Sequence, residues 1–270
     1  MLTVMTQNLN FYGDKHGAWP ERRALLCEAI QENEPDVIAL QAVCSEPEVE
    51  DGRDQATQLA QCMPQYPYVF FYPSRVTDAG REEGCAILSR IALHEPNVRE
   101  LSLRKGLEDD SPRVIQHARF DLEKGSLNVF NAYFSWVEEQ AADNVQECIA
   151  FLGRADGPTL LVGDFNMPSD SPLLTQLEKA GFSDLWAMAH PHEHGYTFEA
   201  DRPDKRIDYA WANEELARRL GSVALVHRNA GAARLSDHLG LKIDLALRTA
   251  EHRPPPHINP RDRRTGLSSM

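Results

Sequence analysis

The stretch LLVGDFN at residues 160–166 decides the fold class of this chain. A short, wholly apolar run that ends at a glycine and polar residues predicts a strand buried on both faces. The run VIAL at residues 37–40 has the same character. Strands of this kind are typical of layered α/β folds, in which helices cover the sheets.

The rest of the chain divides into similar short segments. Helices are predicted over residues 21–34, 54–63, 138–154 and 172–180, and further strands over residues 1–9, 68–72, 85–88, 114–122, 127–134, 206–212, 222–227 and 239–247. Several neighbouring strands are too close together for crossover helices, which favours mixed sheets over one parallel sheet. We therefore predict one domain over residues 1–250. The Pro- and Arg-rich tail, residues 251–270, should be extended or irregular, packed on its own domain or held by a partner.

Composition narrows the functional classes. The N-terminus lacks a basic segment followed by an apolar one, and no apolar run approaches the ~20 residues that span a bilayer. Five scattered cysteines without metal-site spacing are typical of reduced thiols, so we expect a cytoplasmic protein. The net charge of −13 argues against a protein that coats DNA broadly, but it does not exclude a nuclease that holds one strand locally.

Several polar residues lie at the predicted ends of strands, where active sites collect in layered folds. They are Asn8, Asp164, Asn166, Asp208, Asp237 and His238. Each has an ordinary alternative interpretation. An Asp-x-Asn after a strand is usually a turn or a helix cap, a single Asp-His is more often structural, and an Asp within a strand can simply pair with a nearby Arg. Only their combination and order point to chemistry.

Six sequence blocks carry a family resemblance. They are QNLN (residues 7–10), DVIALQAV (36–43), EGCAILSR (83–90), GDFN (163–166), RIDY (206–209) and SDH (236–238). In this order they resemble the endonuclease/exonuclease/phosphatase superfamily, from residue 1 to about residue 247. The resemblance implies a DNase I-like four-layer sandwich, with two stacked mixed β-sheets flanked by helices.

The resemblance also implies a site and a cofactor. A phosphodiester is anionic, so hard oxygen ligands must hold a divalent ion, Mg²⁺ or Mn²⁺, against a phosphate oxygen. Asn8 and Asp237 would help to hold this ion. Asp164 would be the base for the attacking water, and Asn166 would fix the water or the phosphate. His238 would bind a phosphate oxygen and be oriented by Asp208.

Ala42 departs from the family pattern, which places a metal-binding glutamate there. A methyl group cannot coordinate a metal, so metal affinity and rate should fall substantially. Either a deliberate inactivating substitution or a natural non-catalytic protein explains this residue. We favour the substitution, because a degenerate site should have lost other residues too. Glu46 or Glu48 could supply the missing carboxylate ligand only if their loop rearranged.

Tyr133 is the second departure. Phosphatase, sphingomyelinase and deadenylase branches usually have a histidine there, whereas the exonuclease III branch has a tyrosine. A phenol can donate to the phosphate or the leaving oxygen, although its ordinary pKa of ~10 makes it a weak acid. Alternatively, Tyr133 is an ordinary strand aromatic, or it is a second deliberate replacement of a histidine. The following Ser135-Trp136 looks more like the histidine branches.

Weaker candidates are His190, His192 and His194 as a second metal site, Arg113 and Arg119 as phosphate-binding cations on one strand face, and Trp19, Trp136 and Trp186 as stacking platforms for a base. Solvated loop histidines, a solvated strand face and core aromatics are the respective alternatives. We therefore predict a metal-dependent nuclease acting on DNA or RNA, monomeric and impaired by Ala42. A hydrolase of a small phosphodiester, an inositol phosphate or a phospholipid head group is the first alternative. A non-catalytic binding module is the second.

Overall fold

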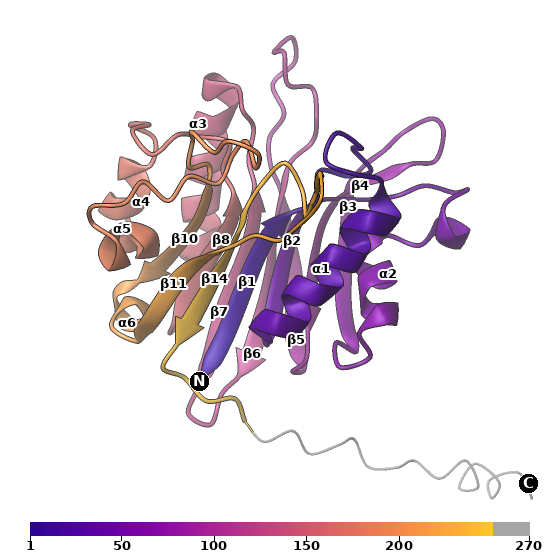
Figure 1. Cartoon of the computed structure of the whole chain (residues 1–270). Coiled ribbons are helices and arrows are strands. Elements are labelled where there is room, and N and C mark those ends of the chain that lie inside the picture. The colour runs from indigo at the N-terminus through magenta and orange to yellow at the C-terminus, as the bar shows by residue number, and fades with distance from the viewer. Residues whose placement is uncertain (251–270) are drawn as a thin grey trace, which may run out of the picture.

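Two six-stranded β-sheets stacked face to face form the centre of the molecule, with helices on their outer faces (Figure 1). The structure, a computed structural model, describes residues 1–250. The predicted four-layer α/β sandwich is thereby confirmed. The prediction for the tail falls on residues 251–270 and lies outside the described residues.

The first sheet has the strand order β11-β14-β1-β2-β4-β3. Its strands are β1 (Leu2–Asn8), β2 (Val37–Ser45), β3 (Tyr68–Val76), β4 (Glu82–Ser89), β11 (Leu220–Val226) and β14 (Gly240–Leu245). The second sheet has the order β5-β6-β7-β8-β10-β9. Its strands are β5 (Leu93–Glu100), β6 (Val114–Asp121), β7 (Ser126–Tyr133), β8 (Thr159–Asp164), β9 (Phe182–Asp184) and β10 (Asp208–Asn213).

The helices and a small hairpin complete the described fold. They are α1 (Trp19–Asn33), the 3₁₀ turn η1 (Glu50–Gly52), α2 (Gln55–Cys62), α3 (Glu138–Leu152), α4 (Thr175–Lys179), α5 (Leu185–Ala189) and α6 (Glu214–Ala217), with β12 (Asn229–Ala230) paired to β13 (Ala233–Arg234). Helix α4 is shorter than the predicted 172–180.

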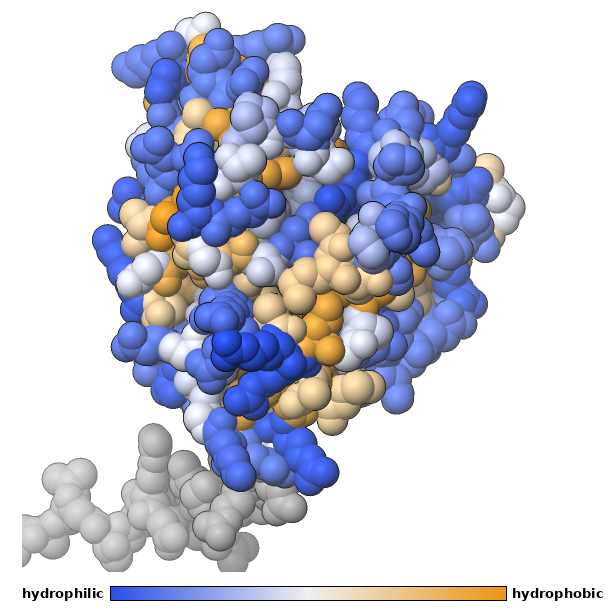
Figure 2. Space-filling model, turned by 90° about the vertical axis from the view of Figure 1, so that its left-hand side faces the viewer, coloured by the Kyte–Doolittle hydropathy of each residue, from blue (hydrophilic) through white to orange (hydrophobic). Residues whose placement is uncertain are grey.

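Within residues 1–250, no helix is both long and apolar enough to cross a membrane. Hydrophilic residues cover most of the side that carries α5 and α6, and hydrophobic ones gather in one area there (Figure 2).

Each central strand is covered on both of its faces, which explains why its sequence is an apolar run. In β2, Val37 packs between the sheets while its neighbour Ile38 packs under α1 and α2. In β8, Leu160 packs between the sheets while Leu161 packs under α3. Because successive strand residues point to opposite faces, a strand covered on both sides must be apolar throughout.

A buried polar network joins the two sheets at Asn131 of β7, which is fully buried. Its Nδ2 donates to the carbonyl oxygens of Leu40 and Ala86 and to Oε1 of Gln116, each at 3.0 Å. Its Oδ1 accepts from Nε2 of Gln41 at 2.6 Å. Both polar atoms of its side chain are therefore hydrogen-bonded, and the contacts with Leu40, Gln41 and Ala86 cross the sheet interface.

The variant Asn131→Leu should lower the free energy of unfolding by roughly 2–4 kcal/mol, since each buried polar group left without a partner costs about 1–3 kcal/mol. Urea denaturation measures this change. The matched control is Asn97→Leu on the exposed face of β5, which should change stability by less than about 0.5 kcal/mol. Equal effects of the two variants would show that the network contributes little.

The topology brings the predicted site residues to one edge of both sheets. Strands β1 and β2 are parallel, as are β7 and β8, so their carboxyl ends point the same way. Strands β14 and β10 run antiparallel to β1 and β8, so their beginnings lie at that edge. The register pairs Asp208 with Asp164 directly.

Candidate active site

Asp164 is placed by a close contact between β8 and β7. The preceding Gly163 has φ +139°, and a Cβ there would lie 1.9 Å from the carbonyl oxygen of Ala132. Only glycine allows this backbone approach. The glycine of the GDFN block therefore sets the position from which the Asp164 side chain projects.

Both carboxylate oxygens of Asp164 have defined partners. Oδ2 accepts from Nδ2 of Asn8 at 2.8 Å, and Oδ1 accepts from the backbone N–H of Asn166 at 2.8 Å. Asn166 has φ +53°, and its Nδ2 donates to the carbonyl oxygen of Phe134 at 2.9 Å. Asp164 is thus held rigidly between the first and second sheets.

His238 lies beside this carboxylate. Its Nδ1 is 2.9 Å from Oδ2 of Asp208, and its Nε2 is 3.9 Å from Oδ2 of Asp164 and 3.8 Å from Oδ1 of Asp237. The ring of Phe198 packs against the imidazole with a centroid distance of 5.0 Å. The contact with Asp208 fixes the ring so that Nε2 faces the other carboxylates.

Charge is distributed unevenly in this cluster. Burial by itself lowers the pKa of His238, but the carboxylates of Asp208 and Asp164 outweigh it and raise this pKa to about 10. Burial, with a contribution from Asp208, raises the pKa of the Asp164 carboxyl to about 7, although His238 opposes the shift. At neutral pH the site therefore holds an imidazolium donor next to a carboxyl group that titrates near the working pH.

Tyr133 ends β7 next to a buried ion pair. The guanidinium of Arg113 lies 4.2 Å from the centroid of the Tyr133 ring, and its Nη2 donates to Oδ2 of Asp109 at 2.8 Å. The hydroxyl of Ser135 donates to the same Asp109 oxygen at 2.6 Å. Burial raises the pKa of Tyr133 to about 12, although Arg113 opposes the shift, so the phenol stays protonated and acts as a hydrogen-bond donor.

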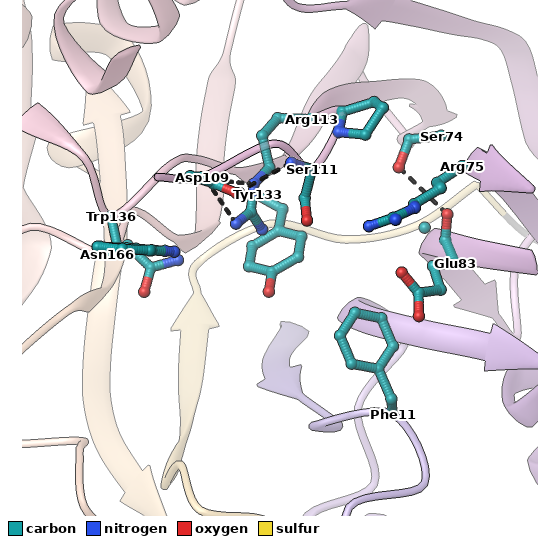
Figure 3. Close-up of a pocket in the computed structure, with 12 residues that line it drawn as sticks. Phe11, Ser74, Arg75, Glu83, Asp109, Ser111, Arg113, Tyr133, Trp136 and Asn166 are labelled. Carbon is teal, nitrogen blue, oxygen red and sulfur yellow. Dashed lines mark hydrogen bonds and ion pairs between the residues drawn. The ribbon is translucent and has the colours of Figure 1, made fainter. Parts of the chain in front are cut away.

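A cavity of about 230 Å³ opens in front of Tyr133 and Asn166. In Figure 3 the Tyr133 hydroxyl points into its centre, with Trp136 on one side and Phe11 on the other. Its remaining lining residues are Ser74, Arg75, Glu83, Gly84, Asp109, Ser111, Pro112 and Arg113. Of the predicted site residues, Tyr133 and Asn166 line this cavity together with aromatic and cationic side chains, and Asp164 adjoins it through its strand pairing with Tyr133.

Sequence reasoning missed part of this lining. Asp109 lies in a loop and belongs to no motif, so only its spacing of four residues from Arg113 could have indicated an ion pair. Of the two strand arginines, Arg113 lines the cavity, whereas Arg119 pairs with Glu95 and Asp121 and is not among the lining residues.

The predicted histidine cluster does not converge either. Nε2 of His190 is 2.8 Å from the carbonyl oxygen of Val223, and its ring packs on Trp186. The ring of His194 stacks on Tyr196. Among residues 1–250, these histidines belong to no group of three ligands that could hold a metal.

The oxygen donors of the site fit a hard divalent ion in type. Oδ1 of Asp237 accepts from the Ser236 hydroxyl, while its Oδ2 makes no hydrogen bond to the described residues. Oδ1 of Asn8 accepts from the backbone of Asn10 at 2.7 Å and has capacity for another partner. Such carboxylate and amide oxygens are suitable ligands for Mg²⁺.

Ala42 lies in a bulge of β2, one residue beyond the position that pairs with Asn8. It is buried and has φ +49°, and its carbonyl oxygen accepts from the backbone N–H of Phe11 at 2.8 Å. Its methyl group supplies no ligand. Glu46 does not replace one, because it pairs with Arg81 at 3.1 Å.

Comparison with known proteins identifies the family of this chain. The model of the endonuclease/exonuclease/phosphatase family matches residues 5–238, and the chain belongs to this family. Members of the superfamily are hydrolases that act on phosphoesters and generally depend on a divalent metal. Comparison with curated proteins by sequence found no significant match.

Solved structures share the fold. An endonuclease/exonuclease/phosphatase from Beutenbergia cavernae has a TM-score of 0.76 and 21% identity, covering 92% of this chain and 71% of its own. A mannosyl-6-phosphatase from Bacteroides thetaiotaomicron has a TM-score of 0.72 and 20% identity, covering 91% and 99%. The 3′ phosphatase NExo from Neisseria, bound to a product DNA hairpin, has a TM-score of 0.64 and 19% identity, covering 91% and 99%.

Proposed function

We propose that this chain has the active site of a metal-dependent phosphodiesterase that acts on DNA or RNA, and that Ala42 impairs it. The observation that carries the proposal is the convergence of His238 and Asp164 beside the cavity into which Tyr133 points. An imidazolium and a phenol can donate to phosphate oxygens, and a carboxylate can act as the base for the attacking water.

Each residue has a role that follows from its contacts. Asp164 accepts the proton of the attacking water when ionised, and Asn166 helps to hold the water or the phosphate. His238 donates from Nε2 to a phosphate oxygen, and Asp208 keeps its ring in position through Nδ1. The Tyr133 hydroxyl donates a hydrogen bond to the phosphate or the leaving oxygen, with Arg113 supplying positive charge beside it.

Asn8 and Asp237 would hold the ion, Mg²⁺ or Mn²⁺. When bound, such an ion neutralises phosphate charge and polarises the phosphorus centre. Without a glutamate at position 42 these two residues provide only one carboxylate. We therefore expect weak ion binding and low activity from this chain.

The lining of the cavity supports a nucleic-acid substrate. Phe11 and Trp136 are separated by the centre of the cavity (Figure 3), and half of the Trp136 side chain is exposed and free to stack on a base. Arg75 adds a cation to the lining of the cavity. We propose that a monomer holds a single strand or a strand end locally, which the net charge of −13 permits.

A small phosphoester is the second candidate, and the compact cavity and the acidic chain favour it. An inositol phosphate, a phospholipid head group or another small phosphodiester would need no extended basic surface. A non-catalytic binding role is the third, and it requires Ala42 to be the natural residue.

A substrate panel tests the proposal. The Ala42→Glu protein should cut single-stranded DNA, duplex DNA or RNA in Mg²⁺ or Mn²⁺ faster than a generic small phosphodiester or phospholipid vesicles. A restored protein that binds the ion and leaves every nucleic acid intact would contradict the nuclease assignment. Preference for vesicles or for inositol phosphates would select the second candidate.

Tyr133→Phe is expected to lower kcat of the Ala42→Glu protein by about 10²–10³-fold, the effect of removing one preorganised donor to a developing negative charge. The phenylalanine ring keeps the contact with Arg113, so the fold should be retained. Steady-state kinetics would show the loss in kcat with little change in KM. Unchanged kcat would mean that Tyr133 is only a packing residue.

A further inference from the structure

A second group of ligand-type side chains lies outside the cluster described above. His16, in the loop between β1 and α1, meets Glu199 and Asp201, in the loop before β10. One ligand atom from each residue lies within 4.8 Å of the others. The three residues come from loops that extend from different sheets.

His16 is almost completely buried, with 2% of its surface exposed. Its Nε2 is 2.7 Å from Oε1 of Glu199, and its Nδ1 is 3.4 Å from Oδ2 of Asp201. Within residues 1–250, the two ring nitrogens of His16 and Oε1 of Glu199 make no hydrogen bond of normal geometry. Buried polar atoms normally have a partner, so these three atoms require an explanation.

The other oxygen of each carboxylate is held by a cation. Lys15 pairs with Oε2 of Glu199, and Nε of Arg234 is 3.1 Å from Oδ1 of Asp201. This leaves Oε1 of Glu199 beside Nε2 of His16 and Oδ2 of Asp201 beside Nδ1. An ion held by one ring nitrogen therefore requires the carboxylate at the other nitrogen to turn toward it, within a group whose ligand atoms already lie within 4.8 Å of one another. Outer partners that orient ligand oxygens in this way are characteristic of protein metal sites.

We propose that His16, Glu199 and Asp201 form a binding site for a divalent transition-metal ion such as Zn²⁺. One imidazole nitrogen with two carboxylate oxygens suits zinc better than Mg²⁺, which selects oxygen ligands alone. The half-exposed Asp201 leaves room for water as a further ligand. The two sites thus differ in chemistry, since the Asn8 and Asp237 donors are oxygens only.

Such an ion would join the two loops next to the active site. The backbone N–H of Ala200 donates to the carbonyl oxygen of Asp237 at 2.7 Å, and that of Arg234 donates to the carbonyl oxygen of His16 at 2.9 Å. A metal bound between these loops therefore fixes the backbone that carries Asp237. Its role is to position that segment, and it makes no contact with substrate.

The test uses the metal-stripped full chain with ZnCl₂. Equilibrium dialysis and elemental analysis count bound zinc, and thermal unfolding measures the rise in Tm that ligand binding to the folded state produces. His16→Gln should remove one zinc ion per chain, or weaken it at least about 100-fold, because losing a ligand should exceed the roughly 10–100-fold cost of outer-shell changes. Excess Mg²⁺ should not displace this ion.

Matched variants separate this site from other histidines. His238→Gln and His192→Gln should keep the zinc ion that His16→Gln removes. Asp201→Ala, which changes a half-exposed side chain, repeats the test if His16→Gln fails to fold. Zinc binding and thermal shift that are the same in the parent, His16→Gln and Asp201→Ala would overturn the proposal. A parent chain that binds no zinc would overturn it too, and would show that ion pairs alone hold His16.

Discussion

Replacing Ala42 by glutamate is expected to raise the metal-dependent rate of phosphodiester hydrolysis by at least about 100-fold, because outer-shell changes alone cost about 10–100-fold and a directly bound carboxylate should contribute more. The added carboxylate would lie one residue beyond the position that pairs with Asn8, close to the proposed ion-binding oxygens. The measurement is the initial rate of cleavage for both proteins at several Mg²⁺ concentrations.

The backbone is compatible with this substitution. Ala42 already has φ +49°, so glutamate incurs no greater left-handed strain than alanine does. The hydrogen bond from Phe11 to the Ala42 carbonyl oxygen does not involve the side chain. A glutamate at this buried position would carry an uncompensated charge unless an ion binds, so Mg²⁺ should raise Tm more for Ala42→Glu than for the parent.

Ala42→Gln is the matched control for this prediction. Its amide has nearly the same size as the glutamate carboxyl but lacks the negative charge, so it should restore little activity and show no added Mg²⁺-dependent rise in Tm. Equal activities of the glutamate and glutamine proteins would mean that position 42 acts through packing. An inactive glutamate protein with no response to Mg²⁺ would remove position 42 from the ion site.

The sequence predicted the layers from local signals, and it predicted the cluster from six blocks that together resemble one family. Apolar runs such as residues 37–40 define strands covered on both faces, and the layered topology then brings their ends to one edge. Asp164 and Asp208 each adjoin such a run, whereas Asn8 ends a strand in which apolar and polar residues alternate. Their meeting with His238 therefore follows from strand direction and register.

Features without a local signal were not predictable. Strand β5 contains Pro96 and its alternation is interrupted at a bulge, which is characteristic of an edge strand and resembles a loop in sequence. The Arg113–Asp109–Ser135 contact joins a loop to the end of β7. His16 and Glu199 are separated by most of the chain and meet only after both sheets have formed.

The second large effect is expected for Asp164→Asn in the Ala42→Glu protein. Removing a positioned base costs about 10²–10⁴-fold in rate, and the amide cannot accept the proton of the attacking water. Single-turnover kinetics on the preferred substrate would measure this loss. Asp156→Asn, an exposed carboxylate in the loop before β8, is the matched control and should leave the rate unchanged.

Stability distinguishes this chemical loss from misfolding. The pKa of Asp164 is raised from its ordinary 3.8 to about 7 in the folded protein, so the folded state holds this proton more tightly than the unfolded state. The protonated Asp164 carboxyl therefore favours the folded state at low pH, and this contribution to the free energy of unfolding is lost as the pH rises from 3.8 to about 7. At pH 8 burial of the ionised group opposes folding, while His238 and the donors Asn8 and Asn166 favour it, so asparagine should leave the metal-free Tm close to that of the parent. A variant that is both inactive and much less stable would show that Asp164 supports the fold instead of the reaction.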